Sequence, residues 1–345
     1  MDMIESPIKR SSTLPDLYPA KLKHSPALKA VSKHIKLPTE RPLKLKPLNS
    51  LIISKPTKPV LSVSNKATWD LRASYSMGDL KLGKCLGRGT QGRVVLATIK
   101  DKECAVKIMH KAEKKAGELE WNILSSSKSP FLISSYGKIN DKDHMYLILE
   151  LMEGGDLFHL IRKRKLNPTE ISFICAEIVL ALEHLHSLGV VYRDLKPENV
   201  MIDSSGHIKL VDFGLSKVIG DERACTTCGS PEYMAPEVIR KQAYSYSADW
   251  WSFGILVYEL FHGYTPFKGE TSAETYENIL EGEISFSRVD IVAENFIRSL
   301  LNPDPKLRLG HSESDIFRIK RHSFFRKIDW AATQEKSQSL LNKNH

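Results

Sequence analysis

The chain has 345 residues, of which 41% are hydrophobic and 26% charged, and its formal net charge is +9. These ordinary globular values argue against a collagen-like, a wholly disordered or a membrane-bundle protein, and no run approaches the ~20 apolar residues of a membrane span. Five cysteines in so long a chain do not form a disulfide framework, and we find no signal peptide. We therefore expect reduced thiols and a cytoplasmic or nuclear location.

The excess positive charge lies at the start of the chain. Residues 1–75 hold 14 basic and 5 acidic residues and 9 of the 17 prolines, whereas the remainder holds 36 residues of each sign. Proline at that density blocks helix and sheet hydrogen bonding. We predict that residues 1–78 form a disordered basic tail that acts in localisation or docking. A basic nucleic-acid or membrane adaptor is an alternative hypothesis, but the balanced charge of the remainder argues against it for the folded part.

From Asp79 onward, short apolar runs typical of strands come first, as in 94–97 and 146–149, and longer helical periodicity follows. Asn167-Pro168-Thr169-Glu170 has the cap residue, proline and acid that are typical of a helix start. One face of this helix is apolar, and Gly189 is expected to end it. The members of that face are Ile171, Ile174, Ile178, Leu182 and Leu185. The pattern predicts a β-rich first part and an α-rich second part.

A glycine-rich segment between two strand-like runs, 86–94, has the pattern G-x-G-x-x-G-x-V. Glycines let the backbone approach phosphates closely, although a plain glycine-rich hairpin is an equally good interpretation of this motif alone. A dinucleotide-binding unit needs a helix after the loop, and the strand that continues here disfavours it. Lys107 follows in the next strand and would hold a phosphate if a carboxylate oriented it. Glu120 is the candidate, and a solvated helix face is the alternative for that residue.

The most specific stretch is Tyr192-Arg193-Asp194-Leu195-Lys196-Pro197-Glu198-Asn199, followed by a strand-turn-strand over 200–211 and by Asp212-Phe213-Gly214. With the glycine loop and Lys107 in the same order, the sequence resembles a eukaryotic protein kinase. The resemblance implies an α+β, bilobal fold over 79–331. The small lobe, 79–150, would be β-rich and the large lobe, 151–331, α-rich.

The resemblance also implies a site for ATP and Mg²⁺. Asp194 would accept the substrate hydroxyl proton, Lys196 would stabilise the transferred phosphoryl group, and Asn199 and Asp212 would bind magnesium. Lys107 and Glu120 would form the ion pair that positions ATP. The other residues expected around the nucleotide are Leu86, Gly87, Arg88, Gly89, Thr90, Gln91, Gly92, Arg93, Val94, Ala105, Glu150, Met152, Asp156 and Met201. A pseudokinase scaffold is the alternative, and the retention of the four central polar residues argues against it.

Later motifs narrow the resemblance to the AGC group, which includes the cyclic-nucleotide-dependent kinases. Lys196 two residues after Asp194 is typical of serine/threonine kinases, and the segments 228–237, 249–254 and 328–330 resemble AGC sequences. The resemblance implies a buried ion pair that braces the large lobe and a residue that holds the catalytic-loop backbone. These roles fall to Glu237 with Arg308 and to Asp249, respectively.

Regulation and substrates follow from the same resemblance. Thr226 would be the activation-loop phosphosite, with Thr227 as the alternative, and Arg193 and Lys217 would contact its phosphate. We predict substrates with arginine two and three residues before the target serine or threonine. The residues expected to bind them are Asp156, Glu198, Glu259 and Ser230. We expect a monomeric catalytic chain that binds no nucleic acid and is served by an upstream kinase or a regulatory subunit.

Several positions depart from the family pattern. Gln91 stands where an aromatic usually shields the phosphates, which predicts slower or leakier chemistry, and Ala116 stands where close relatives have histidine. Ser135 replaces an apolar residue that packs between the lobes. We expect the short tail 332–345 to lack the hydrophobic motif of the group, so that its docking groove is open, holds a partner or is filled by the amino-terminal tail. Cys225 and Cys228 suggest zinc or redox chemistry, but two free thiols explain them more simply.

Overall fold

The computed structural model describes residues 75–89, 91–219, 224, 226, 228–287, 289–312 and 314–337. The chain divides into two units, Met1–Leu45 and Lys46–His345, and every described residue belongs to the second. Most of the predicted amino-terminal tail and part of the carboxyl-terminal one therefore lie outside the described residues. The same holds for Thr90, Cys225 and Thr227.

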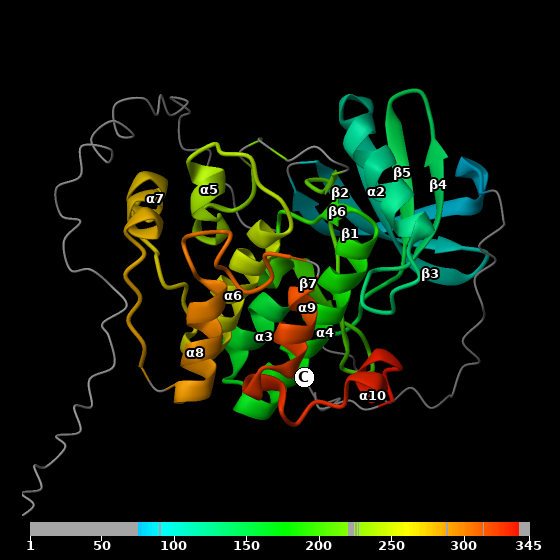
Figure 1. Ribbon diagram of the computed structural model, residues 1–345. Coiled ribbons are helices and arrows are strands. Elements are labelled where there is room, and N and C mark those ends of the chain that lie inside the picture. The colour runs from blue at the N-terminus through cyan, green and yellow to red at the C-terminus, as the bar shows by residue number, and fades with distance from the viewer. Residues whose placement is uncertain are drawn as a thin grey trace, which may run out of the picture. The chain divides into compact units, whose positions relative to one another are not determined.

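The first part of the described chain is a five-stranded antiparallel sheet (Figure 1). Its strands follow the order β1-β2-β3-β5-β4 and are β1 Leu80–Gly89, β2 Gly92–Ile99, β3 Lys102–His110, β4 Ser135–Asn140 and β5 His144–Leu149. Helix α2, Lys114–Ser126, lies against this sheet. Short 3₁₀ turns, Met77–Asp79 and Lys111–Glu113, precede β1 and α2. The predicted strand character of 94–97 and 146–149 is confirmed.

The second part is mainly helical. Its helices are α3 Leu157–Lys163, α4 Pro168–Ser187, α5 Pro236–Ile239, α6 Ser247–His262, α7 Ser272–Glu281, α8 Ile291–Leu300, α9 Asp315–Arg321 and α10 Trp330–Gln334. Two small antiparallel pairs join them: β6 Val190–Val191 with β9 Lys217–Val218, and β7 Val200–Ile202 with β8 Ile208–Leu210. Short 3₁₀ turns lie at Pro197–Asn199, Pro231–Tyr233 and Ser323–Phe325. The predicted bilobal α+β fold is confirmed.

Helix α4 begins and ends as the sequence predicts. The Asn167 side chain accepts hydrogen bonds from the backbone N–H groups of Thr169 and Glu170, and the Glu170 carboxylate accepts one from the Asn167 N–H at 2.9 Å. This reciprocal arrangement satisfies donors that have no partner inside the helix. Gly189 has a φ of +73°, a conformation that glycine adopts without steric cost. All five predicted apolar-face residues are buried.

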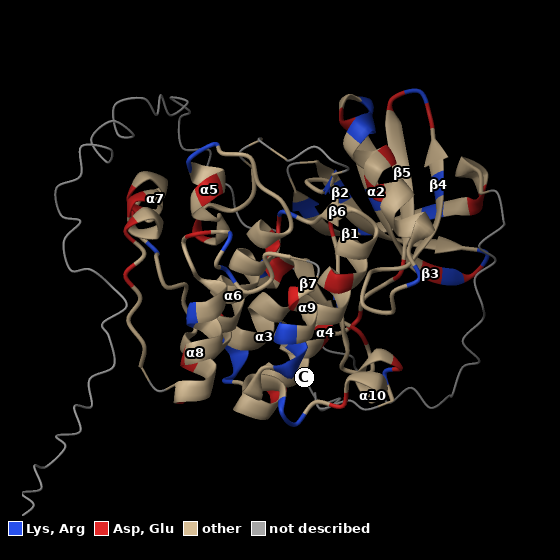
Figure 2. Cartoon of the chain, viewed as in Figure 1, with Lys and Arg blue, Asp and Glu red and all other residues tan. Residues whose placement is uncertain are grey.

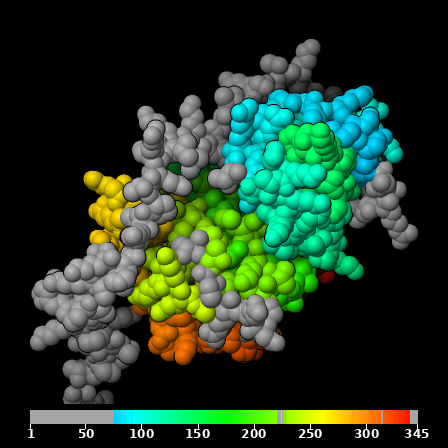
Figure 3. Space-filling model, turned by 90° about the horizontal axis from the view of Figure 1, so that it is seen from above, coloured from blue at the N-terminus to red at the C-terminus, as the bar shows by residue number. Residues whose placement is uncertain are grey.

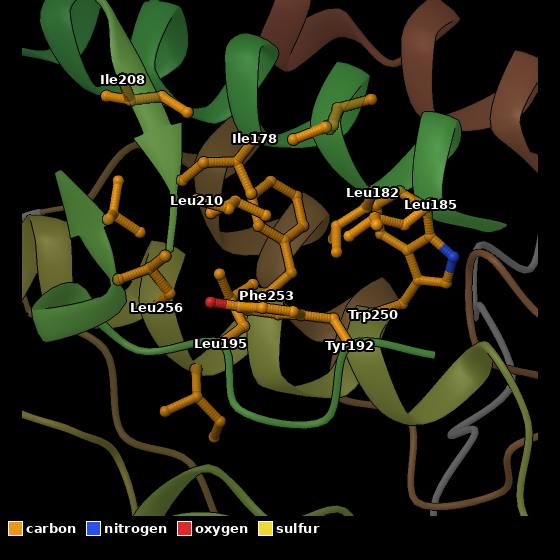
Figure 4. Close-up of a cluster of buried hydrophobic side chains, with 14 of the residues drawn as sticks. Ile178, Leu182, Leu185, Tyr192, Leu195, Ile208, Leu210, Trp250, Phe253 and Leu256 are labelled. Carbon is orange, nitrogen blue, oxygen red and sulfur yellow. The ribbon is translucent and has the colours of Figure 1, made fainter. Parts of the chain in front are cut away.

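The core of the large lobe anchors the loop that carries the most specific motif. Figure 4 shows Tyr192 and Leu195 among apolar side chains of α4 and α6, including Leu182 and Phe253. Tyr192 and Leu195 are buried and flank Asp194 in the sequence, so the loop is fixed on both sides of that carboxylate. Close packing of this kind limits side-chain movement, and it gives Asp194 a defined position.

Charged residues of both signs are interspersed along the described part of the chain (Figure 2), in line with the balanced composition after residue 75. In the space-filling view, the cyan atoms of the strand-rich part lie beside the green atoms of the helix-rich part (Figure 3). Within the described part of the chain, each helix is too short or too polar to cross a bilayer.

Candidate active site

A pocket is bounded by β1, β2 and β3 on one side and by β7 and the segment after β8 on the other. Of the predicted nucleotide-binding residues, its lining includes Leu86, Gly87, Gly89, Gln91, Gly92, Val94, Ala105, Lys107, Glu120, Glu150, Met152, Asp156 and Met201. Arg88 and Arg93 pair with each other across β1 and β2, and both are exposed rather than part of the lining. The sequence predicts both residues around the nucleotide, but their side chains lie outside the pocket lining, because successive strand residues point to opposite faces.

Two apolar residues of the lining were not predicted from the sequence. Ile133 precedes β4, and Val211 directly precedes Asp212. Adjacency to a predicted residue was the available signal for Val211. Ile133 had none, because its place in the pocket depends on how the segment before β4 packs. These side chains, with Leu149, make one end of the pocket apolar and suited to an aromatic base.

The polar end of the pocket is organised around Lys107. Its ammonium group donates to Glu120 at 2.6 Å and to Asp212 at 2.8 Å, so the structure brings the predicted ion pair together and adds the D-F-G aspartate to it. Burial disfavours the charged lysine, but the two carboxylates outweigh this effect and raise its pKa. Burial likewise opposes the ionisation of Asp212, yet Lys107 holds the pKa of that carboxyl below its ordinary value. Both groups are therefore ionised at neutral pH.

The donor set suits a magnesium ion that is shared with a nucleotide. Asn199 and Asp212 line the same pocket, and amide and carboxylate oxygens are the hard ligands that Mg²⁺ prefers. Within the described residues, no group of three or more histidines, cysteines or acids is arranged to hold a metal. An ion at this place would thus take further ligands from phosphate oxygens and water, as magnesium commonly does.

The catalytic-loop residues form a compact hydrogen-bonded group. The Lys196 ammonium donates to Asp194 Oδ2 at 2.8 Å and to Ser230 Oγ at 3.0 Å. The Asn199 amide donates to the backbone oxygen and to Oδ2 of Asp194, both at 2.8 Å. Burial raises the pKa of Asp194, although Lys196 and Asn199 oppose the shift. The group contains a carboxylate, a cation and a serine that come from separate parts of the chain.

Asp249 fixes the backbone of this loop. Its two carboxylate oxygens accept hydrogen bonds from the backbone N–H groups of Tyr192 at 2.9 Å and Arg193 at 2.8 Å, and His186 contacts the same group at 2.8 Å. Arg193 has a φ of +71°, a conformation that non-glycine residues rarely adopt. The paired N–H groups hold that conformation in place, since Asp249 is completely buried at the start of α6.

Arg193 also reaches the predicted regulatory segment. It donates to the backbone oxygen of Leu215 at 2.6 Å and to the Tyr244 hydroxyl at 3.1 Å, and Tyr244 in turn donates to the backbone oxygen of Thr226 at 2.7 Å. Thr226 itself is exposed. Lys217 lies in β9 opposite Val191. The structure thus links Arg193 to Thr226 through Tyr244, a residue that the sequence argument did not identify.

Three acids lie in or beside the catalytic loop, and two of them, Asp156 and Glu259, are buried. One oxygen of Glu198 is buried and has no hydrogen-bond partner among the described residues. Glu259, in α6, accepts a hydrogen bond from the Tyr233 hydroxyl, and burial raises the pKa of Glu259 to about 6. Asp156 begins α3 and accepts from the His159 backbone N–H at 2.8 Å and contacts its ring Nδ1 at 2.7 Å. A buried acceptor without a partner is costly, so a bound hydrogen-bond donor would stabilise Glu198.

Three further predicted positions are not part of the pocket lining. Arg308 donates to both oxygens of Glu237, at 2.7 and 2.9 Å, and both side chains are almost completely buried. Ser135 lies in β4 opposite Leu149, and its buried hydroxyl has no hydrogen-bond partner among the described residues. This placement agrees with the expected loss of packing at Ser135.

Comparisons with known proteins give the family. A model of the protein kinase domain matches residues 80–325. The chain is 41% identical over 266 residues to cAMP-dependent protein kinase catalytic subunit 3 of Drosophila melanogaster, covering 74% of this chain and 46% of the fly protein. It is 38% identical over 275 residues to cAMP-dependent protein kinase type 3 of Saccharomyces cerevisiae, covering 76% of this chain and 68% of that protein.

A third relative is ribosomal protein S6 kinase alpha-2 of Homo sapiens, which is 40% identical over 264 residues, or 72% of this chain and 36% of the human protein. The chain thus spans about half of the fly relative, about two thirds of the yeast relative and about a third of the human one. These relatives belong to the AGC group, and the family uses ATP and Mg²⁺. Pocket, motifs and relatives agree, and the chain belongs to the protein kinase family, within its AGC group.

Proposed function

We propose that this chain transfers the γ-phosphoryl group of ATP to serine or threonine hydroxyls of proteins that carry arginine two and three residues upstream. The observation that carries the proposal is the group formed by Asp194, Lys196 and Asn199 beside Lys107 and Asp212. It supplies a carboxylate for the incoming hydroxyl, a cation for the moving phosphoryl group and a second cation for the remaining phosphates.

In the proposed reaction, the bond between the γ-phosphorus and the β,γ-bridging oxygen breaks while the substrate oxygen bonds to the same phosphorus. Asp194 accepts the hydroxyl proton, and its raised pKa makes it a better base than an exposed aspartate. Lys196, 2.8 Å from Asp194, stabilises negative charge on the transferred group. Asn199 and Asp212 would hold Mg²⁺, which neutralises phosphate charge when it is bound. Lys107 orients the phosphates and is itself held by Glu120.

Glu198 and Glu259 support the arginine preference. Burial raises the pKa of both carboxyls, and the negative charge of Glu198 raises that of Glu259 further by repulsion. An arginine guanidinium placed between them would relieve that repulsion and give Glu198 a hydrogen-bond partner. Asp156 stands near Glu198, but its contacts with His159 engage both of its oxygens. We therefore assign Glu198 and Glu259 the larger share of arginine recognition.

The chain of contacts through Tyr244 supports control by phosphorylation of Thr226. A phosphate on this exposed residue would add negative charge close to Arg193, whose guanidinium already binds the Thr226 segment through Tyr244. The new ion pair would order the segment that carries Ser230. An upstream kinase would add the phosphate, and a regulatory subunit acting in the cytoplasm or nucleus is a further partner that the relatives suggest.

The test is phosphate transfer from ATP by the full chain to a peptide containing Arg-Arg-x-Ser. The wild-type chain should phosphorylate it, whereas Asp194→Asn should lose at least ~100-fold in kcat. A peptide with both arginines replaced by alanine should show a raised KM. Equal transfer by wild type and Asp194→Asn would contradict the activity. Equal KM for the two peptides would contradict the arginine preference and leave the activity standing.

Thr226→Ala provides the test of regulation, with phosphorylation of the chain followed by mass spectrometry. We expect the phosphorylated wild type to have a higher kcat than the unphosphorylated chain, and Thr226→Ala to lack that increase. Thr227→Ala is the matched control, because it changes the neighbouring hydroxyl. If Thr227→Ala, rather than Thr226→Ala, abolishes the increase in kcat, the phosphosite is Thr227.

A further inference from the structure

The side chain of Gln91 reaches from the glycine-rich turn into the polar end of the pocket. Its Oε1 accepts a hydrogen bond from the Lys107 ammonium at 3.3 Å. A Cβ atom placed on Gly214 would lie 1.8 Å from that oxygen and 2.2 Å from Nε2. The amide group therefore lies directly against the backbone of Gly214, where any larger residue would displace it. Gln91 thus connects the turn between β1 and β2 to the D-F-G segment.

Three acceptors surround the Lys107 ammonium among the described residues. They are Glu120 at 2.6 Å, Asp212 at 2.8 Å and Gln91 at 3.3 Å. A lysine ammonium has three N–H donors, so these contacts use all of them. The side chain is only 8% exposed, and water has little access to it. A phosphate oxygen can bind Lys107 only if one of the three acceptors is released.

The three acceptors are not equally strong. Glu120 and Asp212 are carboxylates at short distances, so attraction between opposite charges adds to each of these two hydrogen bonds. Gln91 offers a neutral amide oxygen at the longest of the three distances. It also lies on a turn, whereas Lys107 and Glu120 lie on β3 and α2. Gln91 is therefore the acceptor that a phosphate displaces.

We propose that Gln91 is an exchangeable internal ligand of Lys107, which holds the third donor of the lysine and competes with a nucleotide phosphate for it. The proposal rests on ATP binding in this pocket and not on phosphoryl transfer. This competition affects only ligands with phosphates, which must displace the amide. Adenosine is unaffected, because it has no group that reaches Lys107. Gln91 thereby lowers the affinity for ATP without affecting the apolar end of the pocket.

The experiment is calorimetric titration of the full chain with ATP in magnesium chloride, and separately with adenosine. Gln91→Ala should bind ATP roughly three- to tenfold more tightly than wild type, since one long hydrogen bond to the Lys107 ammonium no longer has to be broken. Gln91→Met keeps the length of the side chain but lacks the amide acceptor, and it should show the same gain. Gln91→Glu should bind ATP more weakly, because its carboxylate would pair with Lys107. Adenosine should bind all four proteins equally.

Lys84→Ala is the charge control for Gln91→Glu, because Lys84 is exposed on β1 and its loss changes the net charge by the same amount. It should leave the Kd for ATP close to that of wild type. Weaker or unchanged ATP binding by both Gln91→Ala and Gln91→Met would overturn the proposal, as would a parallel change for adenosine. If tighter ATP binding is found without phosphate transfer to the peptide, this inference holds and the proposed kinase activity fails.

Discussion

The acid Glu259 makes the arginine preference dependent on pH. It is 4% exposed in α6, and its neighbours include the acids Glu198 and Glu232. Burial and these like charges together raise the pKa of Glu259 to about 6 in the free protein. Lowering the pH through this value protonates the carboxyl and removes a negative charge that would attract the substrate guanidinium. Affinity for arginine-containing peptides should therefore fall in mildly acidic solution.

The magnitude follows from the fraction of Glu259 that is ionised. With a pKa of about 6, the carboxyl is ~97% ionised at about pH 7.5 and ~24% ionised at about pH 5.5. If only the ionised form binds the arginine, kcat/KM for an Arg-Arg-x-Ser peptide should fall about fourfold over this range. The same dependence should be absent for a peptide whose arginine two residues upstream is replaced by alanine.

Initial rates of the full chain at low peptide concentration, measured from about pH 5.5 to 7.5 with the two peptides, provide the assay, since kcat/KM reports the free enzyme. The ratio of kcat/KM for the two peptides is compared across pH, because the titration of other groups such as Asp194 affects both peptides equally and cancels. Glu259→Gln should flatten that ratio and lower it roughly tenfold at neutral pH, because a charge-assisted hydrogen bond is lost. Glu294→Gln, at a more exposed acid, is the control and should behave as wild type. A ratio that does not change with pH in the wild type would refute the reasoning.

Three further predictions concern stability and can be checked by urea unfolding. Arg308→Ala should lower the free energy of unfolding by about 3–5 kcal/mol, because it leaves the buried Glu237 without its partner, whereas Arg298→Ala, which breaks an exposed pair, should cost less than about 1 kcal/mol. Similar losses for the two arginines would contradict this. Ser135→Ala should raise the free energy of unfolding by about 1 kcal/mol, since it removes a buried hydroxyl without a described partner, and a loss would show that the hydroxyl is bonded. Asn167→Ala should cost about 1 kcal/mol at the start of α4 with kcat unchanged, and an altered kcat would be the unexpected result.

Local patterns were sufficient to predict the individual elements. The start of α4 follows from Asn167 and Glu170 because capping involves residues three positions apart. The buried face of the same helix follows from the period of its apolar residues. The order of the motifs was enough to predict the two-lobed kinase fold, because each motif carries a separate part of the chemistry.

Contacts between residues far apart in the sequence could not be predicted from local patterns. Tyr244 joins Arg193 to Thr226, and no local signal marks Tyr244 for this role. The contacts of Asp156 with its neighbour His159 were also unforeseen, since they depend on the conformation of the turn before α3. The exposed side chains of Arg88 and Arg93 show that membership of a motif does not fix which way a strand residue points.

Short motifs and apolar periodicity were enough to identify the family, the order of the lobes and the residue types that phosphoryl transfer needs. Which side chains surround a common cation became visible only in the folded chain. Asp212 is 105 residues from Lys107 along the chain and Gln91 is 16 residues from it, and both meet its ammonium because the sheet and the D-F-G segment face one pocket. The strength of each contact depends on distance and burial, and both are properties of the packed molecule.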